Sequence, residues 1–355
     1  MIEAGMMEAG RIFAAVRRQA LIYLVAVGLA FAVLALLVAL MGFDVLKAFR
    51  YLLTASFKST FGFQETIKKT VPLIFATYAF SIPFMIKFFN IGGWGQMMIG
   101  GTAAAAAGLT LAPLGLPAWI LMPLLIVIGT ASGGLFGMAA GGLKSRWDIN
   151  PIISTIMLNF VAQHFLNFVA TAKPFKDPAE GHPITMPLPA EGTLGFLGGF
   201  PVSFIFAIAA VVFVSFFLKR TRLGFEIRAV GHNQLAAETY GIPFTRAILT
   251  SFFIGGALAG LGGTLETINI HGKLIEGFAK TSGAQYGIFG ILTSLVVGGN
   301  PIGVPFAAFF MSVMLVGADS LQRTMRIPVE LVFLAQGIIV LFIVTVRESM
   351  NAKKR

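Results

Sequence analysis

Cysteine is absent from the 355-residue chain, and charged residues are scarce. Without cysteine, disulfides, thiol catalysis and cysteine-based metal sites are excluded. Only 12% of the residues are charged, against roughly 25% in a soluble domain. The mean hydropathy is +0.86, and apolar runs of about 20 residues, enough to cross the hydrocarbon core of a bilayer, recur along the chain. The composition indicates an all-α, polytopic membrane protein.

The predicted crossings form a single transmembrane domain over residues 20–346. The first crossing follows Arg17 and Arg18 and is longer than the apolar part of a signal peptide, so we expect it to be retained. The eighth is short for a full crossing, which indicates a tilted, broken or re-entrant helix. The ten expected segments are 20–42, 71–89, 93–112, 117–141, 152–171, 200–218, 246–267, 286–299, 302–321 and 328–346.

The distribution of Lys and Arg predicts the orientation of the chain. An even number of crossings places both tails, 1–19 and 347–355, on one side of the membrane. If that side is the cytoplasm, the inner segments, including the loop at 219–245, hold most of the Lys and Arg, once the amphipathic segment 42–70 is assigned to the interface. This bias explains the net charge of +11 without nucleic acid. We expect a multi-pass protein of a prokaryotic plasma membrane.

No catalytic or metal-binding motif is present. The four histidines lack metal-ligand spacing, and neither His-Glu-x-x-His nor Gly-x-Ser-x-Gly occurs. The tract GMAAGGLKS at 137–145 is not a phosphate-binding loop, because Leu143 separates Gly142 from Lys144 and an apolar helix precedes it. We therefore expect no catalytic residue, no metal and no cofactor bound by this chain. A transporter driven by ATP would need its ATPase on another subunit.

The polar residues near the crossings favour a path for a neutral solute over an ion relay. The acids Glu266, Asp319 and Glu330 lie near predicted helix ends, where we expect them to anchor the helices at the interface. Uncharged polar side chains can bind a neutral solute or join helices. Paired interrupted segments, at 89–101 and 286–301, are typical of a transport path between weak internal repeats. The uncharged candidates are Asn90, Gln96, Asn159, Gln163 and Asn300.

The tract TRLGFEIRAVGHNQLAAETYGIP, at 221–243, is too polar for the lipid interior and predicts a small docking element. Asn233 can cap a helix over 234–240, Gly241 can end it in a left-handed conformation, and Pro243 prevents its continuation. The small side chains of Ala236 and Ala237 leave a shallow surface for a partner. Leu235 and Tyr240 can anchor it, with Arg228 and Glu238 at the rim. The alternative is a solvated loop.

The same tract resembles the cytoplasmic coupling loop of permease subunits from ABC importers of the ribose/nucleoside (simple-sugar) class. That loop reads approximately T-x-x-G-x-x-x-R-A-x-G-x-N-x-x-A-A-x-x-x-G-I. Further blocks that resemble the family are FNIG at 89–92 with Gly95 and Gln96, IISTIMLN at 152–159, and GGNPIG at 298–303. The positions that match the loop are Thr221, Gly224, Arg228, Ala229, Gly231, Asn233, Ala236, Ala237, Gly241 and Ile242.

Two positions depart from the family pattern. Trp94 and Pro151 stand where family members usually carry an acid. Both flank the expected path, so the solute can differ from that of well-known members. Trp94 could stack on a base or a sugar face, or it could only fill space.

The resemblance implies a membrane-embedded subunit that moves a nucleoside or a simple sugar. It also implies two cytoplasmic ATPase domains, a second permease subunit, identical or different, and an extracytoplasmic binding protein. The expected ATPase-coupling residues are Arg228, Gly231, Asn233, Leu235, Ala236, Ala237, Tyr240 and Gly241. The expected path residues are Asn90, Trp94, Gln96, Asn159 and Asn300.

Two alternatives remain open at this point. A self-sufficient secondary transporter would work alone and depend on Asp319, whereas a non-transporting scaffold would move nothing with any ATPase.

Overall fold

The computed structural model describes residues 24–276 and 284–352, so the expected tail at 1–19 lies outside the described residues. The chain forms two compact units, 1–62 with 313–355, and 63–312. The boundaries between them fall inside α3 (Thr60–Phe84) and α12 (Val304–Met325). The single transmembrane domain over 20–346 remains a prediction. The all-α, polytopic character is confirmed, because the described residues are mainly helical and several helices can cross a membrane.

Seven helices of the described residues are long and apolar enough to cross a membrane, so ten full crossings are not confirmed. Helix α3 has a polar first half, and the described part of the first apolar segment is Leu24–Leu40. Helix α11 (Ala284–Val296) has 13 residues, which at 1.5 Å each span about 20 Å. The described part of the eighth segment is therefore shorter than a full crossing, and a tilted, broken or re-entrant helix remains a prediction. The seven are Gly93–Leu114, Ala118–Trp147, Pro151–Thr171, Ser203–Arg220, Phe244–His271, Val304–Met325 and Val329–Val346.

The smaller unit contains Leu24–Leu40, α2 (Val45–Thr54), the end of α12 and α13 (Val329–Ala352). Helix α2 is amphipathic, as expected for the segment 42–70, and begins after Asp44, whose side chain accepts a hydrogen bond from the Lys47 N–H (3.0 Å). This backbone donor lowers the pKa of the Asp44 carboxyl. Helix α2 packs closely on α12, because a Cβ on Gly317 would lie 2.2 Å from the Leu52 carbonyl oxygen.

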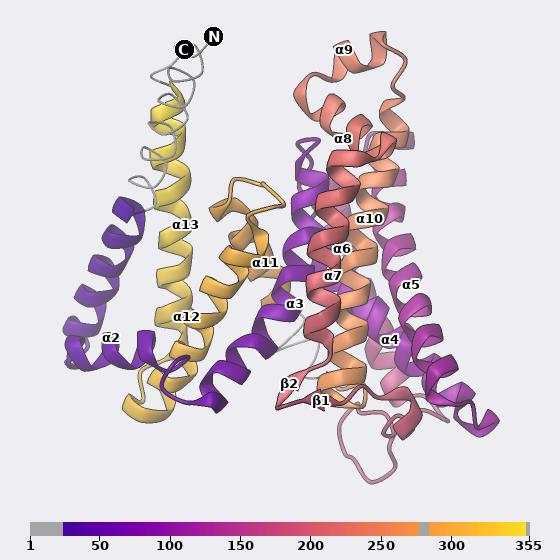
Figure 1. Cartoon of the computed structure of the whole chain (residues 1–355), viewed down its shortest axis with the longest axis horizontal. Coiled ribbons are helices and arrows are strands. Elements are labelled where there is room, and N and C mark those ends of the chain that lie inside the picture. Colours follow the sequence, from indigo (N-terminus) through magenta and orange to yellow (C-terminus); the bar gives the residue numbers. More distant parts are fainter. Residues whose placement is uncertain (1–23, 277–283, 353–355) are drawn as a thin grey trace, which may run out of the picture. The chain divides into compact units, whose positions relative to one another are not determined.

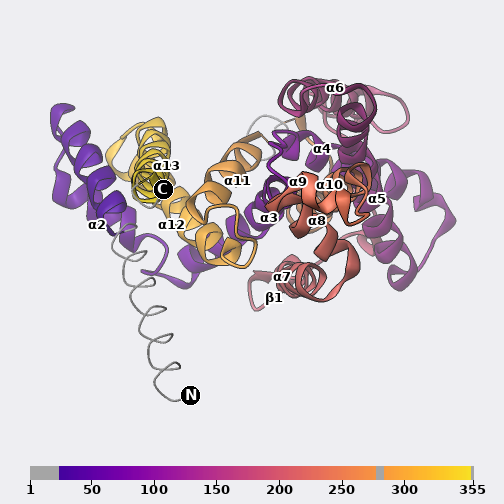
Figure 2. The same cartoon turned by 90° about the horizontal axis from the view of Figure 1, so that it is seen from above.

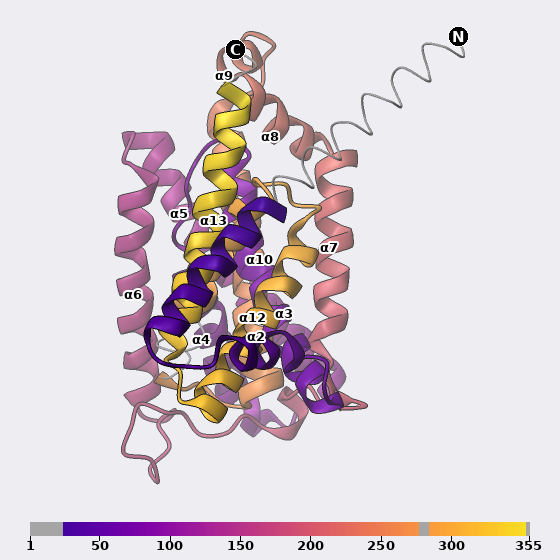
Figure 3. The ribbon, with the colours of Figure 1, turned by 90° about the vertical axis from the view of Figure 1, so that its left-hand side faces the viewer.

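The larger unit is a bundle of long helices with different structures at its two ends. Helices α8 and α9 lie at one end of α7 and α10, and the short strands β1 and β2 lie at the other (Figure 1). Helices α6 and α7 stand at opposite edges of this unit (Figure 3). Its remaining elements are α4 (Gly93–Leu111), η1 (Ala112–Leu114), α5 (Ala118–Trp147), α6 (Pro151–Thr171), η2 (Ala190–Gly192), β1 (Phe196–Leu197), β2 (Phe200–Pro201), α7 (Ser203–Arg220), α8 (Arg222–His232), α9 (Gln234–Thr239), α10 (Phe244–Leu265) and the π-helix η3 (Glu266–His271).

Helix α10 lies between α3, α4 and α5, and its glycines touch their backbones (Figure 2). A Cβ on Gly133 of α5 would lie 2.5 Å from the Gly260 Cα, and one on Gly100 of α4 would lie 2.3 Å from the Gly260 carbonyl oxygen. On α10, Gly256 is similarly close to the Gly133 carbonyl oxygen (2.5 Å). The small residues at four-residue spacing therefore act as the sequence indicated, by letting helix backbones meet.

The connection at 172–202 is fixed to the end of α10. Within η3, Asn269 donates from Nδ2 to the carbonyl oxygens of Leu194 (3.1 Å) and Gly195 (2.8 Å). Its Oδ1 accepts a hydrogen bond from the Ser203 N–H, which begins α7 (2.7 Å). All the polar atoms of this buried amide are thus used, as a buried side chain requires. The connection, η3 and the start of α7 form one hydrogen-bonded group.

The close contact between α5 and α10 predicts that replacing a glycine of α5 by alanine changes the free energy of unfolding in opposite directions at two positions. Gly133→Ala places a methyl group against rigid backbone and should lower the free energy of unfolding by about 1–3 kcal/mol. Gly142→Ala is the matched control, because no atom lies within 4 Å of its Cβ position, and replacing helical glycine by alanine should stabilise by roughly 1 kcal/mol. Thermal unfolding of both variants in detergent tests this. Equal stability of the two variants would contradict the close contact.

Candidate functional site

The tract at 221–243 folds into two consecutive helices. Asn233 caps α9, with its Oδ1 accepting a hydrogen bond from the Ala236 N–H (3.0 Å), and Gly241 ends the helix with φ +78°. The expected cap and stop are therefore confirmed. Helix α8 was not predicted; it begins after its N-cap Thr221, whose Oγ1 accepts a hydrogen bond from the Gly224 N–H (3.1 Å). Its signal was available in this cap and in the spacing of Ile227 and Val230, both buried.

Two glycines allow α8 to lie directly against the bundle. A Cβ on Gly224 would lie 2.2 Å from the Phe217 carbonyl oxygen of α7. A Cβ on Gly231 would lie 2.0 Å from the carbonyl oxygen of Met85, which follows α3. Larger side chains would therefore lift α8 away from both helices. These contacts give Gly224 and Gly231 a structural reason to be glycine.

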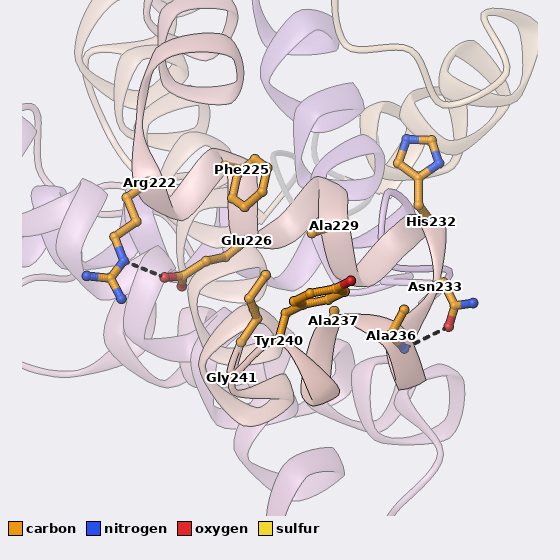
Figure 4. Close-up of a pocket in the computed structure, with 11 residues that line it drawn as sticks. Arg222, Phe225, Glu226, Ala229, His232, Asn233, Ala236, Ala237, Tyr240 and Gly241 are labelled. Carbon is orange, nitrogen blue, oxygen red and sulfur yellow. Dashed lines mark hydrogen bonds and ion pairs between the residues drawn. The ribbon is translucent and has the colours of Figure 1, made fainter.

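A groove of about 610 Å³ separates α8 from α9. Arg222 and Glu226 lie at one end of it, His232 and Asn233 lie at the other, and Tyr240 lies between them (Figure 4). The groove is lined by Arg222, Phe225, Glu226, Ala229, His232, Asn233, Ala236, Ala237, Tyr240, Gly241 and Ile242.

The structure separates the expected coupling residues into exposed and packed ones. Leu235 is 75% exposed and Tyr240 is 87% exposed, so both are available to a partner. The two alanines are not equivalent, because Ala236 is exposed whereas Ala237 is 5% exposed. The shallow surface expected of the pair therefore belongs to Ala236, and Ala237 packs inward. Arg228 does not line the groove, and its Nε donates to the Gly224 carbonyl oxygen (3.4 Å).

Glu226 is a polar group at this site that the sequence reasoning did not select. Its side chain is buried, with Oε1 accepting a hydrogen bond from Arg222 Nε (3.0 Å). Its Oε2 lies 3.6 Å from Arg246 Nε, at the start of α10. The pairing was not visible in the sequence, since the two positions lie in different helices and only the fold brings them together.

Three of the expected path residues form one buried cluster where α4 begins. Asn90 and Gln96 exchange two hydrogen bonds, each of 3.2 Å. Asn159 of α6 accepts from the Gly95 N–H (2.8 Å) and donates to the Ile91 carbonyl oxygen (3.0 Å). The amides thus satisfy the irregular backbone before α4, which the interior of a membrane requires. They join helices in this conformation, and their contact with a solute remains a prediction.

The other path candidates lie in different surroundings. Trp94 is half-buried beside the cluster, and its Nε1 donates to the Met98 sulfur (3.1 Å). A Cβ on Gly287 of α11 would lie 2.6 Å from the Trp94 Cβ, so α11 packs on this residue. Asn300 is exposed and accepts from the Ile302 N–H (3.1 Å), which places it in a turn outside the cluster.

The structure also shows the surroundings of Pro151 and of the three acids near the predicted helix ends. Pro151 is the first residue of α6, a position that suits proline because its missing N–H has no helical acceptor there. Glu266, which we expected to be an interfacial anchor, is buried in η3, where its Oε1 lies 3.6 Å from His271 Nε2. Asp319 is half-buried within α12, whereas Glu330 is exposed in the first turn of α13. Across the described ranges, no three His, Cys, Asp or Glu side chains gather into a metal site.

Long apolar helices packed through glycine, with a small capped helix pair at one end, define a multi-pass membrane protein. The family model described as "Branched-chain amino acid transport system / permease component" matches residues 63–344. The chain therefore belongs to this family of permease components.

The relatives confirm the resemblance to ABC importer permeases. The chain is 31% identical over 327 residues to the guanosine ABC transporter permease protein NupP of Bacillus subtilis, covering 91% of this chain and 92% of that protein. It is 30% identical over 315 residues to the glucose ABC transporter permease protein TsgB13 of Haloferax volcanii, with 85% and 81% covered. It is 28% identical over 336 residues to the nucleoside ABC transporter permease protein NupB of Lactococcus lactis, with 92% and 91% covered. No solved structure matches the chain.

The chain is accordingly the transmembrane permease subunit of an ABC importer and a multi-pass inner-membrane protein. Permeases of this family work with ATPase subunits and solute-binding proteins, so this chain is expected to have partners of both classes.

Proposed function

We propose that this permease moves a nucleoside into the cell, powered by cytoplasmic ATPase domains that bind α8 and α9. The observation that carries the proposal is the exposure of Leu235 and Tyr240 on a capped helix beside a groove. Exposed apolar and aromatic anchors of this kind are typical of protein interfaces. A simple sugar is the second candidate, because the glucose permease of Haloferax volcanii is among the relatives.

The proposal places α8 and α9 in the cytoplasm, together with both chain termini. Arg220, Arg222, Arg228 and Arg246 in or beside this end agree with the excess of basic residues found in cytoplasmic segments. The connection at 172–202, which contains Gly181 and β1 and is hydrogen-bonded to η3, would then face outward; β1 lies at the opposite end of the larger unit from α8 and α9 (Figure 1).

The absence of cysteine makes the orientation directly testable. In right-side-out vesicles, a membrane-impermeant maleimide should label Gly181→Cys and leave Leu235→Cys unlabelled. Both positions are exposed, and nothing lies within 4 Å of the Gly181 Cβ position, so both variants should fold. In inside-out vesicles the pattern should reverse. Labelling of Leu235→Cys from the outside would reject the cytoplasmic placement of the docking element.

Binding of the ATPase to α9 predicts that a cation at Ala236 detaches it. Ala236→Arg adds a long charged side chain on an exposed, groove-lining position and should reduce ATPase co-purification by roughly tenfold or more, since each 1.4 kcal/mol lost is tenfold in affinity. Gly181→Arg, with the same side chain at the opposite end, should leave co-purification unchanged. Ala237→Arg is unsuitable, because Ala237 is packed. Normal recovery of the ATPase with Ala236→Arg would exclude this binding site.

We propose that Trp94 helps to select the solute by stacking on its base. Trp94→Ala should lower the preference for guanosine over glucose by roughly two- to tenfold, because an aromatic contact contributes about 0.5–1.5 kcal/mol. Competition between labelled guanosine and unlabelled glucose, in cells that depend on this importer, measures the preference. Trp119→Ala is the control, since Trp119 is 77% exposed at the start of α5. An unchanged preference would remove Trp94 from the path.

The proposed assembly contains a second permease subunit, of the same or a different sequence, and two ATPase domains. An extracytoplasmic binding protein delivers the solute to the outer mouth. ATP binds to the ATPase partners, and this chain binds no cofactor. Closure of the ATPase domains would displace α9, and the bundle would convert that displacement into alternating access. The family of the chain supports these partner classes, and the exposed helix supplies a surface for one of them.

A further inference from the structure

Helices α8 and α9 differ in how firmly they are attached to the bundle. Within α9 only Ala237 is buried. Within α8 the buried residues are Gly224, Glu226, Ile227 and Val230. A force applied to α9 can reach the long helices through the short connection 240–243, which leads into α10, and through the firmly packed α8.

Glu226 is the charged residue on the buried face of α8. It is 3% exposed and lines the groove between α8 and α9, so its carboxylate lies beside any group that enters there. Its Oε2 faces Arg246 Nε at 3.6 Å, and Arg246 is the third residue of α10. Among the ion pairs of the described residues, this one joins α8 to a membrane-crossing helix.

We propose that Glu226 and Arg246 are positioning residues that transmit movement of the docking element to α10. This inference rests on the proposed function, because it takes α8 and α9 as the ATPase-binding element. Apolar side chains such as Ile227 and Val230 can slide over their neighbours at little cost. A buried carboxylate oxygen resists separation from its cation: if α10 moved away, Oε2 of Glu226 would lose Arg246, while Arg222 would remain paired only with Oε1.

Helix α10 is suited to receive this movement because its backbone contacts its neighbours. A Cβ on Gly260 would lie 2.6 Å from the Gly129 carbonyl oxygen of α5. A Cβ on Gly263 would lie 1.9 Å from the carbonyl oxygen of Met97 in α4, the residue directly after Gln96 of the amide cluster. Displacement of α10 therefore displaces α4 and α5, and it reaches the backbone beside Trp94.

Arg222 supplies a matched control for this role. It also pairs with Glu226, through Nε at 3.0 Å, but it belongs to α8 and lies four residues away along the same helix. Its side chain is 81% exposed. Loss of Arg222 removes one of the two cations beside the Glu226 carboxylate and leaves the ion pair between α8 and α10 in place.

The experiment uses a reporter cysteine in the 172–202 connection, which is hydrogen-bonded to η3 beyond the end of α10. Gly195→Cys suits this purpose, because nothing lies within 4 Å of its Cβ position and its carbonyl oxygen accepts a hydrogen bond from Asn269 of η3 (2.8 Å). The complete complex of this chain with its ATPase subunits is placed in nanodiscs. The rate of maleimide labelling is compared between the nucleotide-free complex and the complex trapped with ATP and vanadate.

We expect trapping to change the labelling rate, and we expect Glu226→Gln and Arg246→Met to reduce that change roughly fivefold or more, in line with typical coupling between sites. ATP hydrolysis and ATPase co-purification should persist in both variants. Arg222→Met and Arg246→Lys, which keep the cation on α10, should retain the change. A full response in Glu226→Gln, or an equal loss in Arg222→Met, would overturn the proposal.

Folding and the proposed function are checked separately. Gln has the size of Glu and can still accept the hydrogen bond from Arg222, and Arg246 is 49% exposed, so Arg246→Met provides a second variant at a tolerant position. Thermal unfolding of both should match that of the unmodified complex. If the proposed function is wrong and the ATPase binds elsewhere, Ala236→Arg will leave the ATPase attached. If only the coupling is lost, Ala236→Arg will still detach the ATPase, whereas in Glu226→Gln the ATPase will stay attached and trapping will no longer change the labelling rate of Gly195→Cys.

Discussion

The direct contact between the backbones of α5 and α10 is the constraint on which the larger unit depends. In lipid, apolar side chains gain nothing by leaving one apolar environment for another, so helices associate through close packing and hydrogen bonds. Gly133, Gly256 and Gly260 bring the two main chains together, and Gly100 adds α4 to the same contact. A helix held this closely cannot shift alone. The mobility that transport requires must therefore come from movement of α10 together with its neighbours.

The division between α8 and α9 follows from their hydrogen bonds and burial. Helix α9 has six residues and is stabilised locally by its Asn233 cap and by the left-handed Gly241, so it keeps its shape with little support from the bundle. Helix α8 lies against α7 and the end of α3 through Gly224 and Gly231. One helix is thereby exposed, and the other connects it to the long helices. This arrangement suits a subunit whose family works with separate ATPases.

The sequence was informative where local chemistry decides the structure. Asn233 and Gly241 determine the ends of α9 through their own backbone geometry, and the glycine spacing in α5 reflects a contact that only glycine permits. Features that depend on tertiary contacts were not predictable. The inward packing of Ala237, the separation of Asn300 from the other amides and the pairing of Glu226 with Arg246 all require knowledge of which helices meet. The burial of Glu266 in η3 was not predictable for the same reason, and its role as an interfacial anchor stays a prediction.

The anchoring of the 172–202 connection by Asn269 has a consequence for control of the importer. Because that connection is hydrogen-bonded to η3, which continues α10, a protein that binds there acts on the same helix as one that binds α8 and α9 at the other end. Binding free energies linked through one element are reciprocal. With α8 and α9 placed in the cytoplasm and bound to the ATPase, as proposed, ATP turnover would depend on what binds the 172–202 connection, and the permease itself would restrain consumption of ATP without cargo.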